Sequence, residues 1–413
     1  MSDQHYYDEL ETRDQAQREK EQFAQLSTQL THAKANASFF TDLLKDIDPQ
    51  SINREVLASI PVTRKSDLVT KQRELPPFGG MTAQGNGLIG RLFQSPGPIY
   101  DPEGRQPDYW RTARGFHAAG FREGDVVLNT LSYHMTPGGF IVEGGARALG
   151  CAVIPAGPGN TEQQLEILRD LKPNGYCGTP SFLRILLEKC DGAGIDTSFM
   201  NKALVTGEAL PPSVRDWFEA RGIKVGQVYA TADIGAIAYE SPAREGLIVD
   251  EGVLVEIVRP GTNDPVVEGE VGEVVVTNLT SQAYPLIRFG TGDLSAVLAG
   301  ESPCGRKNMR IKGWMGRADQ TTKVKGMFVH PGQVNQVVKS FDEIQKGRLV
   351  VTNADNRDAM TLQCEVENGT DDLAKAIGET VQTICKLRGG IEFVAPGSLA
   401  NDGKVIDDIR TYE

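Results

Sequence analysis

The pattern of apolar and polar positions predicts helices at the start of the chain and alternating strands and helices after them. Residues 8–47 carry apolar side chains, among them Phe23, Leu26 and Leu30, spaced between charges, which indicates helices packed on a larger body. From about residue 88, short apolar runs alternate with longer amphipathic stretches. The expected strands are 126–131, 152–155, 175–179, 203–206 and 224–228, and the expected helices are 138–149, 161–171, 181–189 and 212–220. This alternation predicts parallel βαβ units in layered sheets.

The pattern changes twice in the second half of the chain. Residues 245–300 are rich in short apolar runs separated by Gly, Pro and Asn, which predicts a small antiparallel β subdomain. The last hundred residues read as helix, two strands, helix and strand. Their expected ranges are 329–340, 348–353, 361–367, 371–387 and 391–394. We therefore predict an α/β protein whose large N-terminal domain is followed by a small α+β C-terminal domain.

Composition narrows the class of protein. A chain of 413 residues and 44.9 kDa exceeds one simple core, so two or more domains are expected. The formal net charge of -12 argues against nucleic acid as a partner. An anionic substrate would then need local positive charge or a metal ion.

Localisation is the second inference from composition. No window approaches 18 uninterrupted apolar residues, so no membrane span is predicted. The polar, acidic start of the sequence is unlike a secretory signal. The six cysteines are scattered without a CxxC pair, which favours reduced thiols and a cytoplasmic location.

One stretch carries a candidate sugar site. Residues 284–293 read YPLIRFGTGD and follow a strand-like run at 272–277. We expect Asp293 to lie behind a Thr-Gly turn and face a pocket, where its carboxylate can accept from both hydroxyls of a ribose. Arg317, further along, is a donor that could close on the same sugar. The alternative is a hairpin in which a solvated Asp293 pairs with Arg317.

Four further segments carry candidate chemistry. They are VTGEAL with Glu208, YATAD at 229–233, LSYHMTPGG with Tyr133 and His134, and the Gly403-Lys404 pair near the C-terminus. In isolation each has an ordinary structural explanation: a turn after a strand, a Tyr and Asp at a strand end, a hydrogen-bonded histidine and a solvated lysine.

Together these segments resemble the phenylacetate–coenzyme A ligase family of adenylate-forming enzymes. The PVTRKSDL segment at 61–68 and the GRADQTTKVKGMFVHP segment at 316–331 share the resemblance, which covers the whole chain. The resemblance implies an adenylation domain at residues 1–318 and a mobile lid at 319–413, with Asp319 as the hinge. It implies activation of a carboxylic acid, expected to be aromatic, with ATP, Mg2+ and coenzyme A. A homodimer is left open.

The resemblance also assigns roles to single residues. Tyr229 would stack on adenine, which Glu208, Ala230 and Thr231 would border. Asp233 would replace the family's glutamate as the magnesium ligand, one methylene shorter. Asp293 and Arg317 would hold the ribose, and Lys404 would act on the α-phosphate. Lys325 and Gly326 would line the thiol channel, while Tyr133, His134 and Gly235 would border the acyl pocket.

One segment departs from the family. At residues 93–104, where the family has a Ser/Thr/Gly-rich phosphate loop ending in Gly-Lys, this chain reads FQSPGPIYDPEG. Its three prolines lack an N–H donor, it contains no lysine, and it adds Asp101 and Glu103. Either the outer phosphates are held in another way or full adenylation is weakened. Two alternatives follow: an acyl-adenylate former with another acceptor, or a non-catalytic nucleotide-binding homologue.

Overall fold

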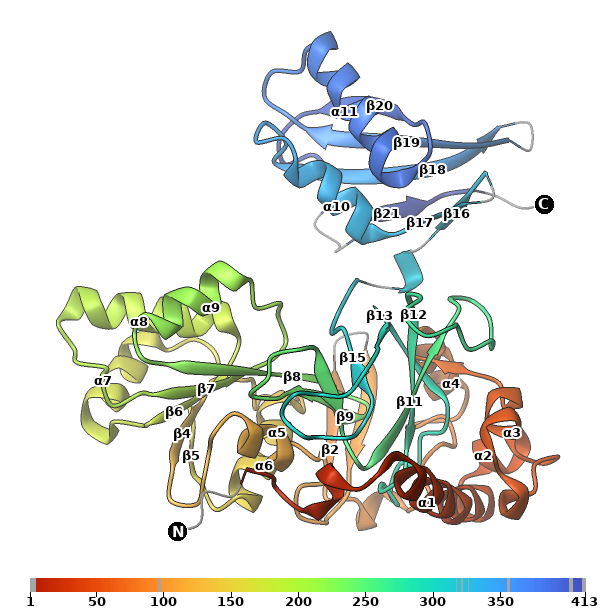
Figure 1. Cartoon of the computed structure of the whole chain (residues 1–413), viewed down its shortest axis with the longest axis vertical. Helices are drawn as coiled ribbons and strands as arrows, with labels where there is room; N and C mark the ends of the chain where they lie inside the picture. The colour runs from red at the N-terminus through yellow and green to blue at the C-terminus, as the bar shows by residue number, and fades with distance from the viewer. Residues whose placement is uncertain are drawn as a thin grey trace. The chain divides into compact units, whose positions relative to one another are not determined.

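The computed structural model folds the chain into two compact units (Figure 1). It describes residues 5–95, 98–316, 318–320, 322–325, 327–354, 357–400 and 404–410. The first unit comprises Met1–Thr291 and Ser295–Trp314, and the second comprises Gly292–Leu294 and Met315–Glu413.

The first unit contains a nine-stranded sheet whose parallel half confirms the predicted βαβ units. Neighbouring strands β5, β4, β6, β7 and β8 all pair in parallel. Helices α8 and α9 cover one face of these strands, and α5 (Ala113–Ala118) and α6 cover the other (Figure 1). The strands are β4 (Val126–Asn129), β5 (Ala152–Pro155), β6 (Gly175–Gly178), β7 (Lys202–Val205) and β8 (Lys224–Thr231). The helices between them are α6 (Gly138–Ala148), α7 (Thr161–Leu171), α8 (Pro180–Ala193) and α9 (Pro212–Glu219).

The other half of the sheet and a second sheet supply the predicted antiparallel region. Strand β8 pairs antiparallel with β9 (Gly235–Glu240), which continues through β10 (Leu247–Val249) and β15 (Arg310–Ile311) to β14 (Val297–Leu298). A four-stranded sheet has the order β1-β13-β12-β11. Its strands are β1 (Thr63–Arg64), β13 (Phe289–Ser295), β12 (Gly272–Asn278) and β11 (Val253–Val258).

The N-terminal helices are present as predicted, and they pack on this second sheet. They are α1 (Gln15–Asn36), α2 (Ser38–Leu43), α3 (Arg54–Ser59) and α4 (Leu68–Glu74). Leu26 and Leu30 of α1 share one buried core with Val274 and Val276 of β12. At the start of α4, Asp67 occupies the capping position, but its side chain forms no capping hydrogen bond.

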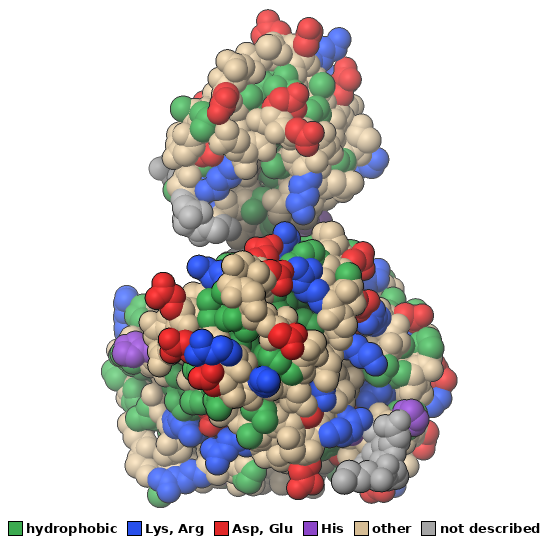
Figure 2. Space-filling view, turned by 90° about the vertical axis from the view of Figure 1, so that its left-hand side faces the viewer, with side chains coloured by type: hydrophobic (Ala, Val, Ile, Leu, Met, Phe, Trp, Pro, Cys, Tyr) green, Lys and Arg blue, Asp and Glu red, His purple; other side chains and the backbone are tan. Residues whose placement is uncertain are grey.

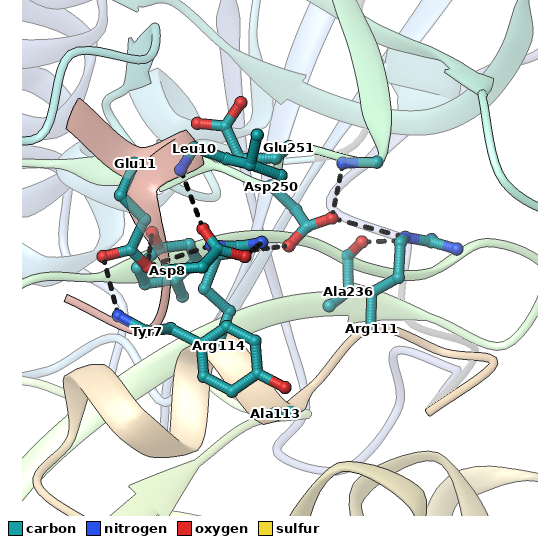
Figure 3. A network of polar contacts seen from close by, with 12 residues as sticks. Tyr7, Asp8, Leu10, Glu11, Arg111, Ala113, Arg114, Ala236, Asp250 and Glu251 are labelled. Carbon is teal, nitrogen blue, oxygen red and sulfur yellow. Dashed lines mark hydrogen bonds and ion pairs between the residues drawn. The ribbon is translucent and has the colours of Figure 1, made fainter. Parts of the chain in front are cut away.

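A largely buried ionic network joins the N-terminal segment to the rest of the first unit (Figure 3). The Arg114 guanidinium lies 2.7 Å from Asp8 and 3.5 Å from Asp250. Glu11, only 1% exposed, pairs with Arg306 at 3.0 Å. Burial raises the pKa of Glu11, and the positive charges of Arg306 and Arg114 oppose that shift.

The second unit is the predicted small α+β domain. Strands β20 (Gly390–Val394), β19 (Arg357–Glu365), β18 (Lys346–Ala354) and β21 (Ile406–Asp408) form one sheet in that order. Helices α10 (Pro331–Lys339) and α11 (Asp371–Cys385) share its core. The first helix begins at Pro331 and not at 329, because β17 (Met327–Val329) pairs with β16 (Thr322–Val324).

The surface of each unit mixes charges of both signs: Figure 2 shows acidic and basic side chains interspersed over the visible faces. Within the described part of the chain, every helix is too short or too polar to cross a bilayer.

Candidate active site

The site forms where β8 ends and the chain turns into β9. The register of these two strands shifts between Tyr229 and Ala230. Tyr229 donates from its hydroxyl to Thr291 Oγ1 at 3.3 Å, and Thr231 Oγ1 accepts from the Ile234 N–H at 3.2 Å. Gly235 has φ +82, and a Cβ there would lie 2.7 Å from the Trp110 carbonyl oxygen. Only glycine fits this turn, which fixes the backbone beside Asp233.

Asp233 is a fully buried carboxylate that forms an ion pair with Lys65. Its side chain is 0% exposed, and its Oδ2 accepts from Lys65 Nζ at 2.6 Å. Its Oδ1 is buried and has no hydrogen-bond partner among the described residues. Lys65 follows β1, whose parallel pairing with β13 holds it in place.

A second buried carboxylate, Asp101, belongs to the same cluster. It lies on β3 (Ile99–Glu103), opposite Phe93 of β2 (Arg91–Ser95), and is 0% exposed. Neither of its oxygens has a hydrogen-bond partner among the described residues. Burial first, and the charge of Asp233 second, raise the pKa of Asp101 to about 7, while the Ser95 hydroxyl and then Lys65 oppose the shift. The Ser95 hydroxyl lies close enough to Asp101 to stabilise its charged form, and it donates a long hydrogen bond of 3.4 Å to the Ile99 carbonyl.

The segment aligned with the family's phosphate loop is a β-hairpin. The Gln94 N–H donates to the Met135 carbonyl at 2.9 Å, and the Tyr100 N–H donates to Gln72 Oε1 at 2.8 Å. A phosphate cradle needs successive backbone N–H groups turned toward the anion. The N–H groups of Gln94 and Tyr100 therefore already have acceptors in the protein and are not available to an anion; Pro96 and Gly97 lie outside the described residues.

The residues expected around the acyl pocket diverge in exposure. Tyr133 is half-buried, accepts from Asn129 Nδ2 at 2.6 Å and packs edge-on against Phe140. Burial, and then the charge of Glu143, raise the pKa of its phenol. His134 is exposed, and its backbone N–H lies 3.4 Å from Ser132 Oγ. Glu208 is exposed as well and accepts weakly from the Ser181 N–H at 3.4 Å.

Asp293 corrects one expectation. It does not follow a Thr-Gly turn but lies within β13 and is 7% exposed. Gly292 has φ +76, yet β13 continues through it from Phe289 to Ser295. Arg317 and Gly326 lie outside the described residues, and so does the side chain of Asp319, whose backbone belongs to a short 3-10 helix (Ala318–Gln320).

Two predicted lysines belong to the second unit. The Lys404 side chain is 52% exposed, and its Nζ lies 2.8 Å from Asp407 Oδ1. Lys325 is exposed at a turn with φ +48, and its N–H donates to Asp358 Oδ2 at 2.8 Å. Gly403, beside Lys404, lies outside the described residues.

Sequence reasoning assigned no role to two members of the buried cluster. Asp101 stood out only as an acid in a place where the family has none, and Lys65 only as part of the PVTRKSDL segment. The sequence did contain one signal for this cluster. Charged side chains are rarely buried unless they are paired, and the first domain has both an additional acid, Asp101, and a lysine, Lys65.

These features define a class. An open sheet whose parallel strands end at a cluster of charged residues is typical of α/β enzymes that bind nucleotides or other anions at that edge. The AMP-binding enzyme family matches residues 108–280, and the AMP-binding enzyme C-terminal domain matches residues 326–408. The chain therefore has the two domains of an AMP-binding enzyme.

The particular family follows from full-length similarity. The phenylacetate–coenzyme A ligase of Thermus thermophilus is 30% identical over 394 residues, covering 91% of this chain and 87% of that protein. The enzyme of the same name from Aromatoleum evansii is 29% identical over 363 residues, or 84% and 81% of the two chains. The chain therefore belongs to the phenylacetate–coenzyme A ligase family, and the predicted class, an AMP-forming acid–thiol ligase, is confirmed.

Solved structures confirm the fold class. An open conformation of 2-hydroxyisobutyryl-CoA ligase, in complex with 2-HIB-AMP and CoA, matches with a TM-score of 0.83 at 24% identity, over 98% of this chain and 95% of that one. The same ligase in its postadenylation state with 2-HIB-AMP matches with a TM-score of 0.77 at 25% identity, over 99% and 93% of the chains.

Proposed function

We propose that the protein activates a carboxylic acid with ATP as an acyl-adenylate and transfers the acyl group to coenzyme A. The single observation that carries this proposal is that similarity to coenzyme A ligases extends through both units of the chain. The structure of 2-hydroxyisobutyryl-CoA ligase with an acyl-adenylate supports the same order of reactions, in which an adenylate precedes the thioester.

The proposed nucleotide roles follow the sequence assignments. The half-buried Tyr229 ring offers a flat surface for adenine, with Glu208, Ala230 and Thr231 along its border. Asp293, with Arg317, is proposed to bind the ribose. The burial of Asp293 supports this role, because a shielded carboxylate forms stronger hydrogen bonds to hydroxyl groups than a solvated one.

Asp233 is the proposed ligand for magnesium, and its surroundings fit the ion. A carboxylate oxygen is the hard donor that magnesium prefers, and Oδ1 of Asp233 is buried without a hydrogen-bond partner among the described residues. When bound, the ion would supply positive charge to the phosphates.

The second unit is proposed to act as the mobile lid, with residues 319–413 as its extent and Asp319 as its hinge. Lys404 is proposed to stabilise charge on the α-phosphate during adenylation, and the exposure of its ammonium group is consistent with that role. Lys325 and Gly326 are proposed to border the path of the coenzyme A thiol.

The acid is proposed to be aromatic, because several curated relatives are phenylacetate ligases. Tyr133 packs edge-on against Phe140, which gives this segment an aromatic surface. Tyr133, Gly235 and His134 remain the proposed border of the acyl pocket. We also propose a cytoplasmic location, in line with six cysteines that are all free thiols.

The unusual sequence at residues 91–103 supports a second candidate function, a nucleotide-binding protein without ligase activity. A third candidate is an adenylating enzyme that transfers the acyl group to another acceptor. Pyrophosphate release should be measured over a panel of aryl and aliphatic acids, with and without coenzyme A. Pyrophosphate with thioester supports the proposal. Pyrophosphate without thioester supports another acceptor, and no pyrophosphate with any acid supports the binding protein.

A further inference from the structure

The cluster of Asp101, Asp233 and Lys65 carries an unbalanced charge. Three of its carboxylate oxygens, both of Asp101 and Oδ1 of Asp233, are buried without a partner among the described residues. Among the described residues, Asp233 and Lys65 are charged groups that act on the Asp101 carboxyl, and the Ser95 hydroxyl is a neutral group that stabilises its charged form. Two carboxylates and one ammonium leave one negative charge, which is costly in a site shielded from water.

We propose that Asp101 and Asp233 together form a divalent-cation site that exists before any nucleotide binds. In this site the Lys65 ammonium, on a side chain that is 24% exposed, lies at the solvent side and Asp101 at the buried side. The assignment of Asp233 rests on the proposed function, whereas the participation of Asp101 rests on the structure of this chain.

The donor set selects the kind of ion. Both side chains offer only oxygen, which suits Mg2+ or Mn2+ better than softer metals. The described residues hold no cluster of three His, Cys, Asp or Glu side chains suited to a metal, so the protein contributes two carboxylates here. Magnesium sites that serve phosphates commonly use one or two carboxylates and complete their coordination with water and phosphate oxygens.

Both carboxylates are held by rigid elements. Asp101 lies within the β2–β3 hairpin, in register with Phe93, and Pro102 follows it. Asp233 precedes the turn in which Gly235 packs against Trp110. Ligands fixed in this way need little reorganisation to bind an ion, which favours binding in the free protein.

The proposal also explains why the hairpin carries an acid. With the cation bound, the charges of the ion, Lys65, Asp101 and Asp233 sum to plus one, which attracts a triphosphate. Without it they sum to minus one, which repels the nucleotide. The cation held by Asp101 thus takes over the attraction that the backbone N–H groups of a phosphate loop supply in other enzymes.

The competing arrangement is a protonated Asp101 that donates a hydrogen bond to Asp233 and leaves no place for an ion. The two arrangements differ in whether the free protein binds a divalent cation. They also differ in the consequence of replacing Asp101 by asparagine, which keeps the shape of the side chain but removes its charge.

The test is a titration of Mn2+ into the full chain at pH 8 without nucleotide, followed by the electron paramagnetic resonance signal of free Mn2+. The proposal expects one bound ion per chain, with affinity reduced at least tenfold in Asp101→Asn. Asp191→Asn is the control, since its carboxylate is 52% exposed and pairs with Arg221 at 2.7 Å. The control should bind Mn2+ as the unmodified protein does.

Two results would overturn the proposal: no binding of Mn2+ to the unmodified protein, or equal affinity in Asp101→Asn. The first measurement needs no variant, so it decides the matter even if Asp101→Asn does not fold. We expect the variant to fold, with a melting temperature in EDTA at least equal to that of the unmodified protein, because it removes a buried unpaired charge. A failed acid panel would overturn the ligase proposal and leave the Mn2+ titration unaffected.

Discussion

Lys65→Met tests the buried cluster through stability. Methionine retains the apolar stem of lysine and removes the ammonium that lies 2.6 Å from Asp233 Oδ2. Removing one partner of a fully buried ion pair costs about 3–5 kcal/mol. The Lys65 side chain is 24% exposed, so solvent screens part of the interaction, and we expect a loss of about 2–3 kcal/mol in the free energy of unfolding.

Tryptophan fluorescence during urea unfolding in EDTA measures this loss in the first unit alone. All three tryptophans, Trp110, Trp217 and Trp314, belong to that unit. The double variant Lys65→Met/Asp233→Asn should recover much of the loss, because it no longer leaves the Asp233 charge unpaired. A Lys65→Met protein as stable as the unmodified one, or a double variant that loses the sum of the single losses, would refute the reasoning.

Three further predictions concern the nucleotide, the lid and pH. Asp293→Ala should weaken ATP binding by on the order of 1.5–3 kcal/mol without changing acid preference; calorimetry showing unchanged affinity would exclude the ribose role. Lys404→Ala should slow pyrophosphate release by about 10²–10³-fold and leave thioester formation from synthetic acyl-adenylate nearly intact; equal losses in the two assays would contradict the lid role. Burial, and then the nearby Arg122 charge, lower the pKa of His117 to about 4. The unfolded chain therefore binds a proton that the folded chain does not, and stability should fall as pH drops from about 6.5 to about 4. His117→Gln should flatten that decline in melting scans; an identical pH profile would count against it.

The sequence predicted the elements well where one periodicity dominates. The alternation from 126 to 228 produced β4 to β8 and the helices between them, because each parallel strand is an apolar run and each helix is amphipathic. The same reasoning recovered the order of elements in the second unit. Helix α10 was misplaced at its start because an apolar pair, Phe328 and Val329, fits a strand as well as a helix.

The sequence could not show contacts made across long separations. The Lys65–Asp233 pair joins residues 168 positions apart, and only the sheets bring β1 near the end of β8. The burial of Asp101 depends on the hairpin that replaces the expected loop. For Asp293, Thr-Gly before an acid is a good turn signal, but these residues lie within strand β13 of the four-stranded sheet, and this tertiary context overrides the local preference.

The most direct test of the central claim is an isotope experiment. A carboxylic acid that the enzyme accepts is labelled with oxygen-18 in both carboxyl oxygens and incubated with ATP, Mg2+ and coenzyme A. If the carboxylate attacks the α-phosphorus, mass spectrometry will find one labelled oxygen in AMP and the other in the acyl-coenzyme A. Unlabelled AMP, or labelled phosphate accompanied by ADP, would contradict the acyl-adenylate mechanism.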